Sequence, residues 1–147
     1  MKKIIISLSL ILAVGLSSSF ATDNVRVGNK VQQSFKKEFA AAQAVSWSAI
    51  GEYLKATFII GGHRAEAYYD AQGEFAGCIR DLFYDQLPLT VMKTLDKNFA
   101  QADILDVREI TNEEGTFYKL TLEANNAKYI VKLNNTGNIV EKGRAKK

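Results

Sequence analysis

The sequence predicts an α+β fold in which two tandem helix-plus-antiparallel-sheet repeats form one curved sheet with helices packed on one face. The first observation is internal similarity, because segment 31–39 (VQQSFKKEF) aligns with 91–99 (VMKTLDKNF) at an offset of about sixty residues. Segment 52–75 aligns with 116–139 at a similar offset. The second observation is that each copy has a helical apolar stripe followed by alternating apolar and polar residues.

Each predicted helix places its apolar residues on one side. The stripes comprise Val27, Val31, Phe35 and Phe39 in the first helix, and Val91, Leu95 and Phe99 in the second. Such spacing aligns side chains along one face of a helix. We expect the first helix to end in the run AAAQA at 40–44. Pro88 suits the first turn of the second helix, where its missing N–H costs nothing.

Two short loops fix the pairing of the central strands. Gly61-Gly62 and Asn125-Asn126 are residue types that tolerate positive φ, as two-residue hairpin loops require. The implied pairs are Phe58 with Ala65, Ala56 with Ala67, Leu54 with Tyr69, Leu122 with Tyr129, Leu120 with Val131, and Tyr118 with Leu133. These residues should form the face that the helices cover.

The remaining strands follow from turns of one kind. Asp70 to Gly73 and Asn134 to Gly137 place Asp or Asn first and Gly fourth, as type I turns prefer. They lead into strands predicted at 74–80 and 138–142. Two weaker patterns predict strands before the hairpins, at 45–50 and 104–110.

The N-terminus has the pattern of a secretory signal peptide. Lys2 and Lys3 precede an apolar run, and Ser19-Phe20-Ala21 fits a cleavage site. We therefore expect a signal peptide at 1–21 and a single domain at 22–147 in a periplasmic or secreted bacterial protein, with repeat one at about 25–82 and repeat two at about 87–142. The apolar run is too short to span a bilayer, so no membrane span is expected after cleavage.

Composition excludes several functions. The chain has 19 Lys and Arg against 16 Asp and Glu, and loss of Lys2 and Lys3 leaves the mature chain nearly neutral, which gives no case for nucleic acid. Cys78 is the single cysteine, so an internal disulfide and Cys/His metal spacing are absent from the sequence. We expect a buried thiol and a monomer, with an intermolecular disulfide as the alternative.

No catalytic or cofactor motif is present in the sequence. His63 is the single histidine and is expected at an exposed strand end beside a turn, without the orienting acid that a Ser-His-Asp site needs. Gly61-Gly62 joins strands instead of opening a helix, so it is not a phosphate loop. The sequence thus predicts a protein that is not an enzyme and needs no cofactor or metal.

Several of these features together resemble the PepSY-like family of small exported bacterial proteins, also described as β-lactamase-inhibitor-like. They are the first helix, VSW at 45–47, the Tyr53 strand, AEAYYDAQGEF at 65–75, LP at 87–88 and a more divergent second copy. The resemblance covers nearly all of the mature chain. It implies tandem helix-plus-sheet repeats and no catalytic residue, and a likeness of fold does not establish function.

The best candidate site is the sheet face opposite the helices, which we call the open face. Register places there Tyr53, Lys55, Thr57, Ile59, Arg64, Glu66, Tyr68, Phe117, Lys119, Thr121, Glu123, Lys128, Ile130 and Lys132. Aromatic residues beside cations are typical of binding surfaces. The candidate partner-binding residues are Tyr53, Lys55, Tyr68, Phe117, Lys119 and Lys132.

Lys119 and Lys132 are expected to face one another, a like-charge pair that costs stability. We expect them to be flanked by Phe117, and by Tyr53 and Lys55 if the copies join into one sheet. Trp47 lies two residues after Val45, so both side chains point to the same face of the predicted strand. We expect Trp47 to pack in the core, with a contact to a ligand as the alternative.

Three functions remain open at this point. The first is a non-catalytic exported binding module, an interaction partner or inhibitor of an envelope or extracellular protein with an acidic surface. The second is a small-ligand binder on the concave sheet, which would need a deep pocket where the pattern places lysines. The third is a hydrolase with an unrecognised site, which has the least support.

Overall fold

The computed structural model describes residues 25–145, and the predicted signal peptide at 1–21 lies outside them. The described chain contains two α-helices, one short 3-10 helix and eight strands. In chain order the elements are α1 (Asn29–Glu38), β1 (Gln43–Ile50), β2 (Tyr53–Ile60), β3 (His63–Tyr69), β4 (Phe75–Asp81), η2 (Tyr84–Gln86), α2 (Leu89–Phe99), β5 (Asp103–Asn112), β6 (Gly115–Ala124), β7 (Ala127–Asn134) and β8 (Ile139–Arg144).

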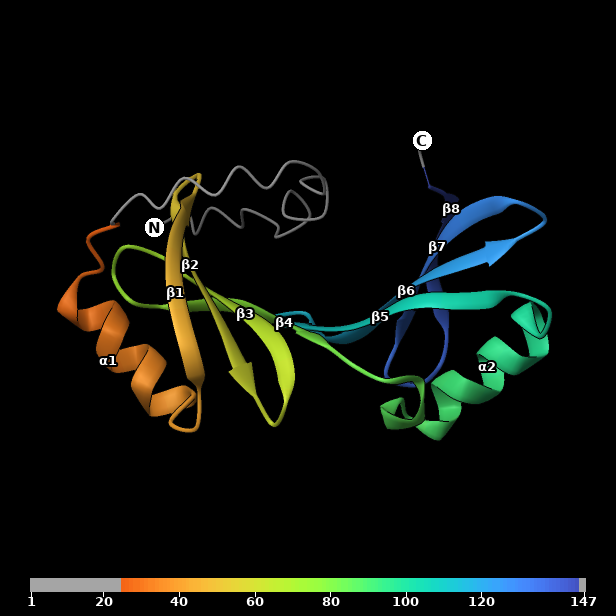
Figure 1. The fold of residues 1–147 in the computed structure, drawn as a ribbon, viewed down its shortest axis with the longest axis horizontal. Coiled ribbons are helices and arrows are strands. Elements are labelled where there is room, and N and C mark those ends of the chain that lie inside the picture. The colour runs from red at the N-terminus through yellow and green to blue at the C-terminus, as the bar shows by residue number, and fades with distance from the viewer. Residues whose placement is uncertain (1–24, 146–147) are drawn as a thin grey trace.

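All eight strands form one open antiparallel sheet in the order β1-β2-β3-β4-β5-β6-β7-β8. The sheet is strongly curved, and α1 and α2 lie near its two ends (Figure 1). The pairing of β4 with β5 joins the first four strands to the last four. The prediction of a curved α+β sheet with two helices is therefore confirmed.

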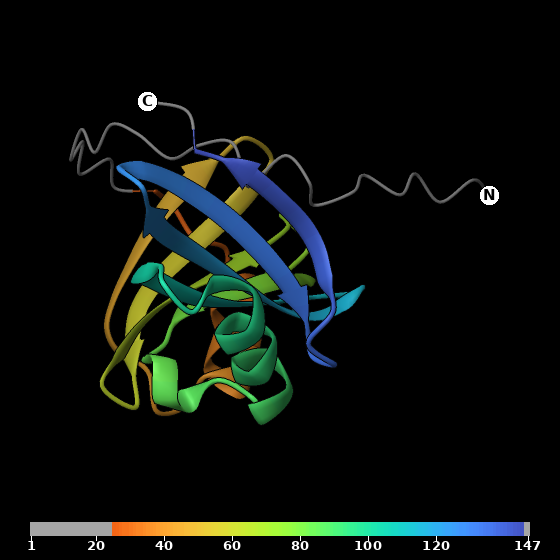
Figure 2. The same cartoon turned by 90° about the vertical axis from the view of Figure 1, so that its right-hand side faces the viewer.

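Both helices cover the same face of the sheet. Directly paired residues in a sheet point to one side. The pairs continue from Ala65 through Arg80, Glu109 and Tyr118 to Leu133, which places all five on a common face. Ala65 belongs to the core under α1, and Tyr118 and Leu133 belong to the core under α2. Figure 2 shows the helices on one side with the strands curving above them.

Two separate hydrophobic clusters lie under the two helices. Under α1, Val31 and Phe35 pack with Ala56, Phe58, Ala65, Ala67 and Tyr69. Under α2, Val91 and Leu95 pack with Leu87, Val107, Tyr118, Leu120, Leu122, Val131 and Leu133. The apolar stripes predicted from four-residue spacing therefore do face the sheet. Trp47 packs at 5.3 Å from Phe35 between ring centroids, so its expected core role is also confirmed.

The predicted hairpin register is correct at every pair. β2 pairs with β3 as Leu54 with Tyr69, Ala56 with Ala67 and Phe58 with Ala65. β6 pairs with β7 as Tyr118 with Leu133, Leu120 with Val131 and Leu122 with Tyr129. Asn125 and Asn126 both have positive φ, as their loop requires.

The end of the first helix is the main departure from the sequence prediction. The helix ends at Glu38, and β1 already begins at Gln43, inside the alanine-rich run that was expected to continue the helix. Phe39 leaves helical geometry with φ −123°, and its ring packs 4.8 Å from Phe58. Strand pairing of Gln43 with Ile59 outweighs the helix propensity of alanine here.

Candidate protein-binding face

The open face has its polar centre on β3, around the carboxylate of Glu66. This carboxylate accepts a 2.8 Å hydrogen bond from the Tyr68 hydroxyl and forms ion pairs with Arg64 and with Lys55, the latter at 3.6 Å between Nζ and Oε1. Burial opposes ionisation of Glu66, but the Tyr68 hydrogen bond and the charges of Lys55 and Arg64 outweigh it, so the pKa is lowered. Glu66 therefore forms ion pairs with two cations of this face and offsets part of their positive charge.

Tyr68 lies on the open face but is buried, contrary to the exposure expected for it. Only 4% of the residue is accessible. Burial and the hydrogen bond to Glu66 both raise the pKa of the phenol. On the neighbouring strand Gly77 pairs with Tyr68 and presents no side chain, and the register of β3 and β4 shifts between Tyr68 and Tyr69. Tyr68 is thus a support for Glu66 and offers little surface to a partner.

Three cations occupy consecutive strands on the other half of the open face. Arg108 of β5 pairs with Lys119 of β6, and Lys119 pairs with Lys132 of β7. We call Arg108, Lys119 and Lys132 the cation row. The predicted opposition of Lys119 and Lys132 is confirmed, whereas Arg108 was missed because its position depends on the pairing of β5 with β6. The two residues that join these strands, Glu113 and Glu114, lack the glycine or asparagine by which the other two-residue loops were recognised.

The three cations of the row differ in the acidic or aromatic groups that lie next to them. Arg108 Nε lies 3.0 Å from an Asp106 carboxylate oxygen and 3.6 Å from one of Asp81. Lys132 Nζ lies 4.3 Å from the centre of the Phe117 ring, a cation–π contact. Among residues 25–145, the ion pairs of the open face involve Lys55, Arg64 and Arg108, and neither Lys119 nor Lys132.

Lys119 is the cation of this row whose pKa is lowered by its surroundings. Burial, together with the adjacent charges of Arg108 and Lys132, lowers the pKa of its ammonium group, and Glu141 and Asp106 only partly compensate. The sheet therefore holds a half-buried lysine whose pKa is lowered and which forms no ion pair among the described residues. An added anion at this point would be favourable.

An apolar strip crosses the centre of the open face beside the cation row. Ile79 of β4 pairs with Ile110 of β5, and Ile110 pairs with Phe117 of β6. Ile110 is buried, and the other two are half-buried. Phe117 was predicted on the open face. The two isoleucines were not, because the junction between β4 and β5 was not predicted. Apolar and aromatic residues next to cations give this half the composition of a binding surface.

The six predicted partner-binding residues fall into two groups and not into one cluster. Tyr53 and Lys55 lie on β2, whereas Phe117 and Lys119 lie on β6, with β3, β4 and β5 between them. Four strand spacings separate the two groups by about 19 Å along the sheet. The expectation that Tyr53 and Lys55 flank Lys119 is therefore wrong, and Phe117, Lys119 and Lys132 form the candidate site with Arg108.

The residues that could hold a metal ion or act as a catalytic base can be examined directly among residues 25–145. Within residues 25–145, no group of three or more His, Cys, Asp or Glu side chains is arranged to hold a metal ion. His63 contacts the Gln86 amide at 3.2 Å and the Phe83 ring, and neither group is an acid that would orient a catalytic imidazole. No helix among these residues is both long and apolar enough to cross a membrane.

Comparison with solved structures defines the fold class. A BLIP-like protein from Bacteroides fragilis NCTC 9343 matches with a TM-score of 0.76 at 21% identity, over 84% of this chain and 89% of that chain. A DUF2874 family protein from Bacteroides uniformis ATCC 8492 matches with a TM-score of 0.74 at 20% identity, over 81% and 90% of the two chains. The chain therefore has the BLIP-like fold.

A third similar structure carries a cellular location in its name. It is a candidate periplasmic protein from Bacteroides eggerthii DSM 20697, with a TM-score of 0.74 and 18% identity over 82% of this chain and 90% of that chain. No family model and no curated protein sequence matches the chain. At these identities the likeness concerns the fold.

Proposed function

We propose that this protein is an exported, non-catalytic binding module that recognises an acidic surface of another protein through the open face. The observation that carries the proposal is the cation row, Arg108, Lys119 and Lys132, beside the half-buried ring of Phe117. Acidic side chains of a partner would neutralise the row, and an apolar side chain would pack on the isoleucines and the phenylalanine. The partner is an envelope or extracellular protein.

The energetic cost of the row supports a binding role. Like charges directly opposite one another on adjacent strands are destabilising by a few tenths of a kcal/mol. The chain places two such pairs in succession and partly buries the central lysine. A partner carboxylate would remove this repulsion, and electrostatic complementarity of this kind favours rapid and specific association.

The order of the helices and strands supports a domain built from two repeats. We infer that residues 25–82 and 87–142 are tandem copies within a PepSY-like domain, because each copy has a helix followed by four strands and an equivalent Asp/Asn-x-x-Gly turn. The BLIP-like neighbours support a protein-binding role without identifying the partner. A concave ligand site or a hydrolase is less favoured, because the open face presents lysines and arginines.

Export of the protein places the interaction outside the cytoplasm. We propose that cleavage after Ala21 releases a monomer into the periplasm or the medium, as the signal-like N-terminus indicates. The periplasmic name of the Bacteroides eggerthii neighbour supports this location. Mass spectrometry of protein recovered from the periplasm or medium should find Thr22 at the N-terminus, and recovery of chains that retain Met1 would contradict the proposal.

Partner capture with matched lysine variants tests the function. The immobilised mature protein should retain a partner from periplasmic extract, and Lys119→Thr/Lys132→Thr should lose it. The control is Lys36→Thr/Lys37→Thr, which removes two exposed lysines from α1 without changing the open face. Retention by the wild type should weaken as salt rises, because salt screens exposed charges. Equal retention by both double variants would overturn the proposal.

A further inference from the structure

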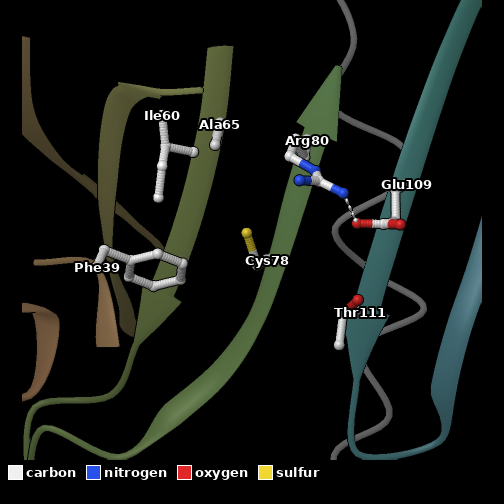
Figure 3. A pocket seen from close by; sticks show the side chains of 7 residues that line it. All are labelled: Phe39, Ile60, Ala65, Cys78, Arg80, Glu109 and Thr111. Carbon is white, nitrogen blue, oxygen red and sulfur yellow. Dashed lines mark hydrogen bonds and ion pairs between the residues drawn. The ribbon is translucent and has the colours of Figure 1, made fainter. Parts of the chain in front are cut away.

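A pocket opens on the opposite side of the sheet from the cation row, in the gap between the two hydrophobic clusters. Its volume is about 270 Å³. The side chains that line it are Phe39, Ile60, Ala65, Cys78, Arg80, Glu109 and Thr111. Figure 3 shows apolar groups on one side, the Cys78 thiol at the base, and the charged pair on the other side. The pocket thus lies on the face that the helices cover, where the two halves of the sheet meet.

The apolar wall of the pocket is well anchored. The Phe39 ring stacks at 4.8 Å from Phe58 and 5.5 Å from Phe35, both of which are core residues. Ile60 and Ala65 continue this wall on β2 and β3. A small aliphatic or aromatic side chain is the group that such a wall accommodates.

The polar wall is an ion pair between neighbouring strands. Arg80 Nη2 donates to Glu109 Oε1 at 2.9 Å, and the Tyr118 hydroxyl donates to Glu109 Oε2 at 3.4 Å. A guanidinium has five N–H donors and a carboxylate has about four acceptor positions, so both groups retain free capacity. Their side chains are 42% and 22% exposed, so a ligand in the pocket can reach them.

The charge of this wall selects among ligand classes. A lone carboxylate would bind Arg80 but meet repulsion from Glu109, and a lone amine would bind Glu109 but meet repulsion from Arg80. A zwitterion satisfies both groups. We propose that the pocket binds a free apolar α-amino acid, with its carboxylate on Arg80, its ammonium group on Glu109 and its side chain against Phe39 and Ile60.

The experiment compares leucine with two molecules that keep its branched side chain but each lack one of its two charged groups. L-leucine, 4-methylpentanoate and 3-methylbutylamine are titrated separately into the isotope-labelled protein while its amide NMR signals are recorded. Leucine should shift the signals of the pocket strands β3, β4 and β5 saturably. Each analogue lacks one charged group and should bind about tenfold more weakly, the effect of one charge-assisted contact. Equal binding of leucine and both analogues would overturn the proposal.

Matched variants locate the binding to this pocket. Arg80→Gln and Glu109→Gln should each weaken leucine binding by about tenfold, and Arg108→Gln on the open face should leave it unchanged. Cys78→Met changes no charge but fills the base of the pocket, so it should abolish binding even if a charge variant fails to fold. Undiminished leucine affinity in folded Cys78→Met protein would contradict this placement.

Discussion

Gly137 lies directly against the first turn of α2, where a Cβ atom would come within 2.4 Å of the Thr90 carbonyl oxygen. The backbone at Gly137 has φ +84°, a conformation that side chains disfavour. The turn is closed by the Asn134 side chain, whose Oδ1 accepts from the backbone N–H groups of Thr136 and Asn138. A side chain at position 137 would therefore suffer both backbone strain and a clash with the Thr90 carbonyl oxygen.

We predict that Gly137→Ala destabilises the protein by at least about 2 kcal/mol. Gly73→Ala is the matched control, because Gly73 has φ +85° but its Cβ would lie 3.1 Å from Lys30. Its cost should be smaller. Urea unfolding monitored by circular dichroism gives both values, and an equal cost at the two glycines would show that the contact with Thr90 is unimportant.

Phe35 is the aromatic centre of the α1 core, with ring contacts to Phe39, Trp47 and Phe58 between 5.0 and 5.5 Å. Because Phe35 is only 5% exposed, Phe35→Ala should cost about 3–5 kcal/mol. Phe39 is half-buried at the end of the helix, so Phe39→Ala should cost less. Equilibrium denaturation distinguishes them, and a Phe35→Ala loss below about 1 kcal/mol would contradict the packing of α1 on the sheet.

Cys78 should react slowly with thiol reagents in the folded protein. Burial raises the pKa of its thiol to about 11, so the reactive thiolate is scarce near neutral pH. Labelling should accelerate as the pH approaches that value and should be fast in urea. Rapid labelling of the native protein at neutral pH, or a dimer that a reductant dissociates, would contradict a half-buried thiol with a raised pKa.

Glu66 should contribute to stability in a pH-dependent way. Its folded pKa is lowered from 4.5, so its contribution is complete above that value and is lost as the pH falls through the lower folded value. Glu66→Gln should therefore lower the free energy of unfolding more at about pH 7 than at about pH 3, as measured by urea unfolding. The control is Glu113→Gln in an exposed turn. A pH-independent difference would contradict the ionic role of Glu66.

Local patterns in the sequence predicted the two halves of the fold well. Helical spacing located Val31 and Phe35, and two-residue loops gave the register of both hairpins, because each signal depends on neighbouring residues. The end of α1 was wrong because pairing of β1 with β2 overrides alanine propensity. The loop Gly51-Glu52 joins the two strands, but a register shift between Gln43 and Ser46 separates the start of β1 from that loop, so the loop does not determine where the strand begins.

The candidate site was predicted less completely for a related reason. Lys119 and Lys132 belong to one hairpin, so their opposition followed from the Asn125-Asn126 loop. Arg108 joins the site through the pairing of β5 with β6, whose two-residue loop Glu113-Glu114 lacks the glycine or asparagine that marks the other hairpin loops. Ile79 joins it through the pairing of β4 with β5, which no short loop connects. Tyr68 is buried beside Gly77 and next to a register shift between β3 and β4, and alternation along one strand does not specify the neighbouring strand or its irregularities.

Site-specific photo-crosslinking shows whether a partner protein contacts the open face beside the cation row. A benzophenone amino acid replaces Phe117 beside the cation row, and in a control protein it replaces Leu89, which is 73% exposed on α2. Each mature protein is irradiated with periplasmic extract, and its adducts are identified by mass spectrometry. We expect an acidic protein to be crosslinked through position 117, and this adduct to be lost in Lys119→Thr/Lys132→Thr. Crosslinking of the same protein through position 89 alone, or undiminished by that double substitution, would contradict a binding site on the open face.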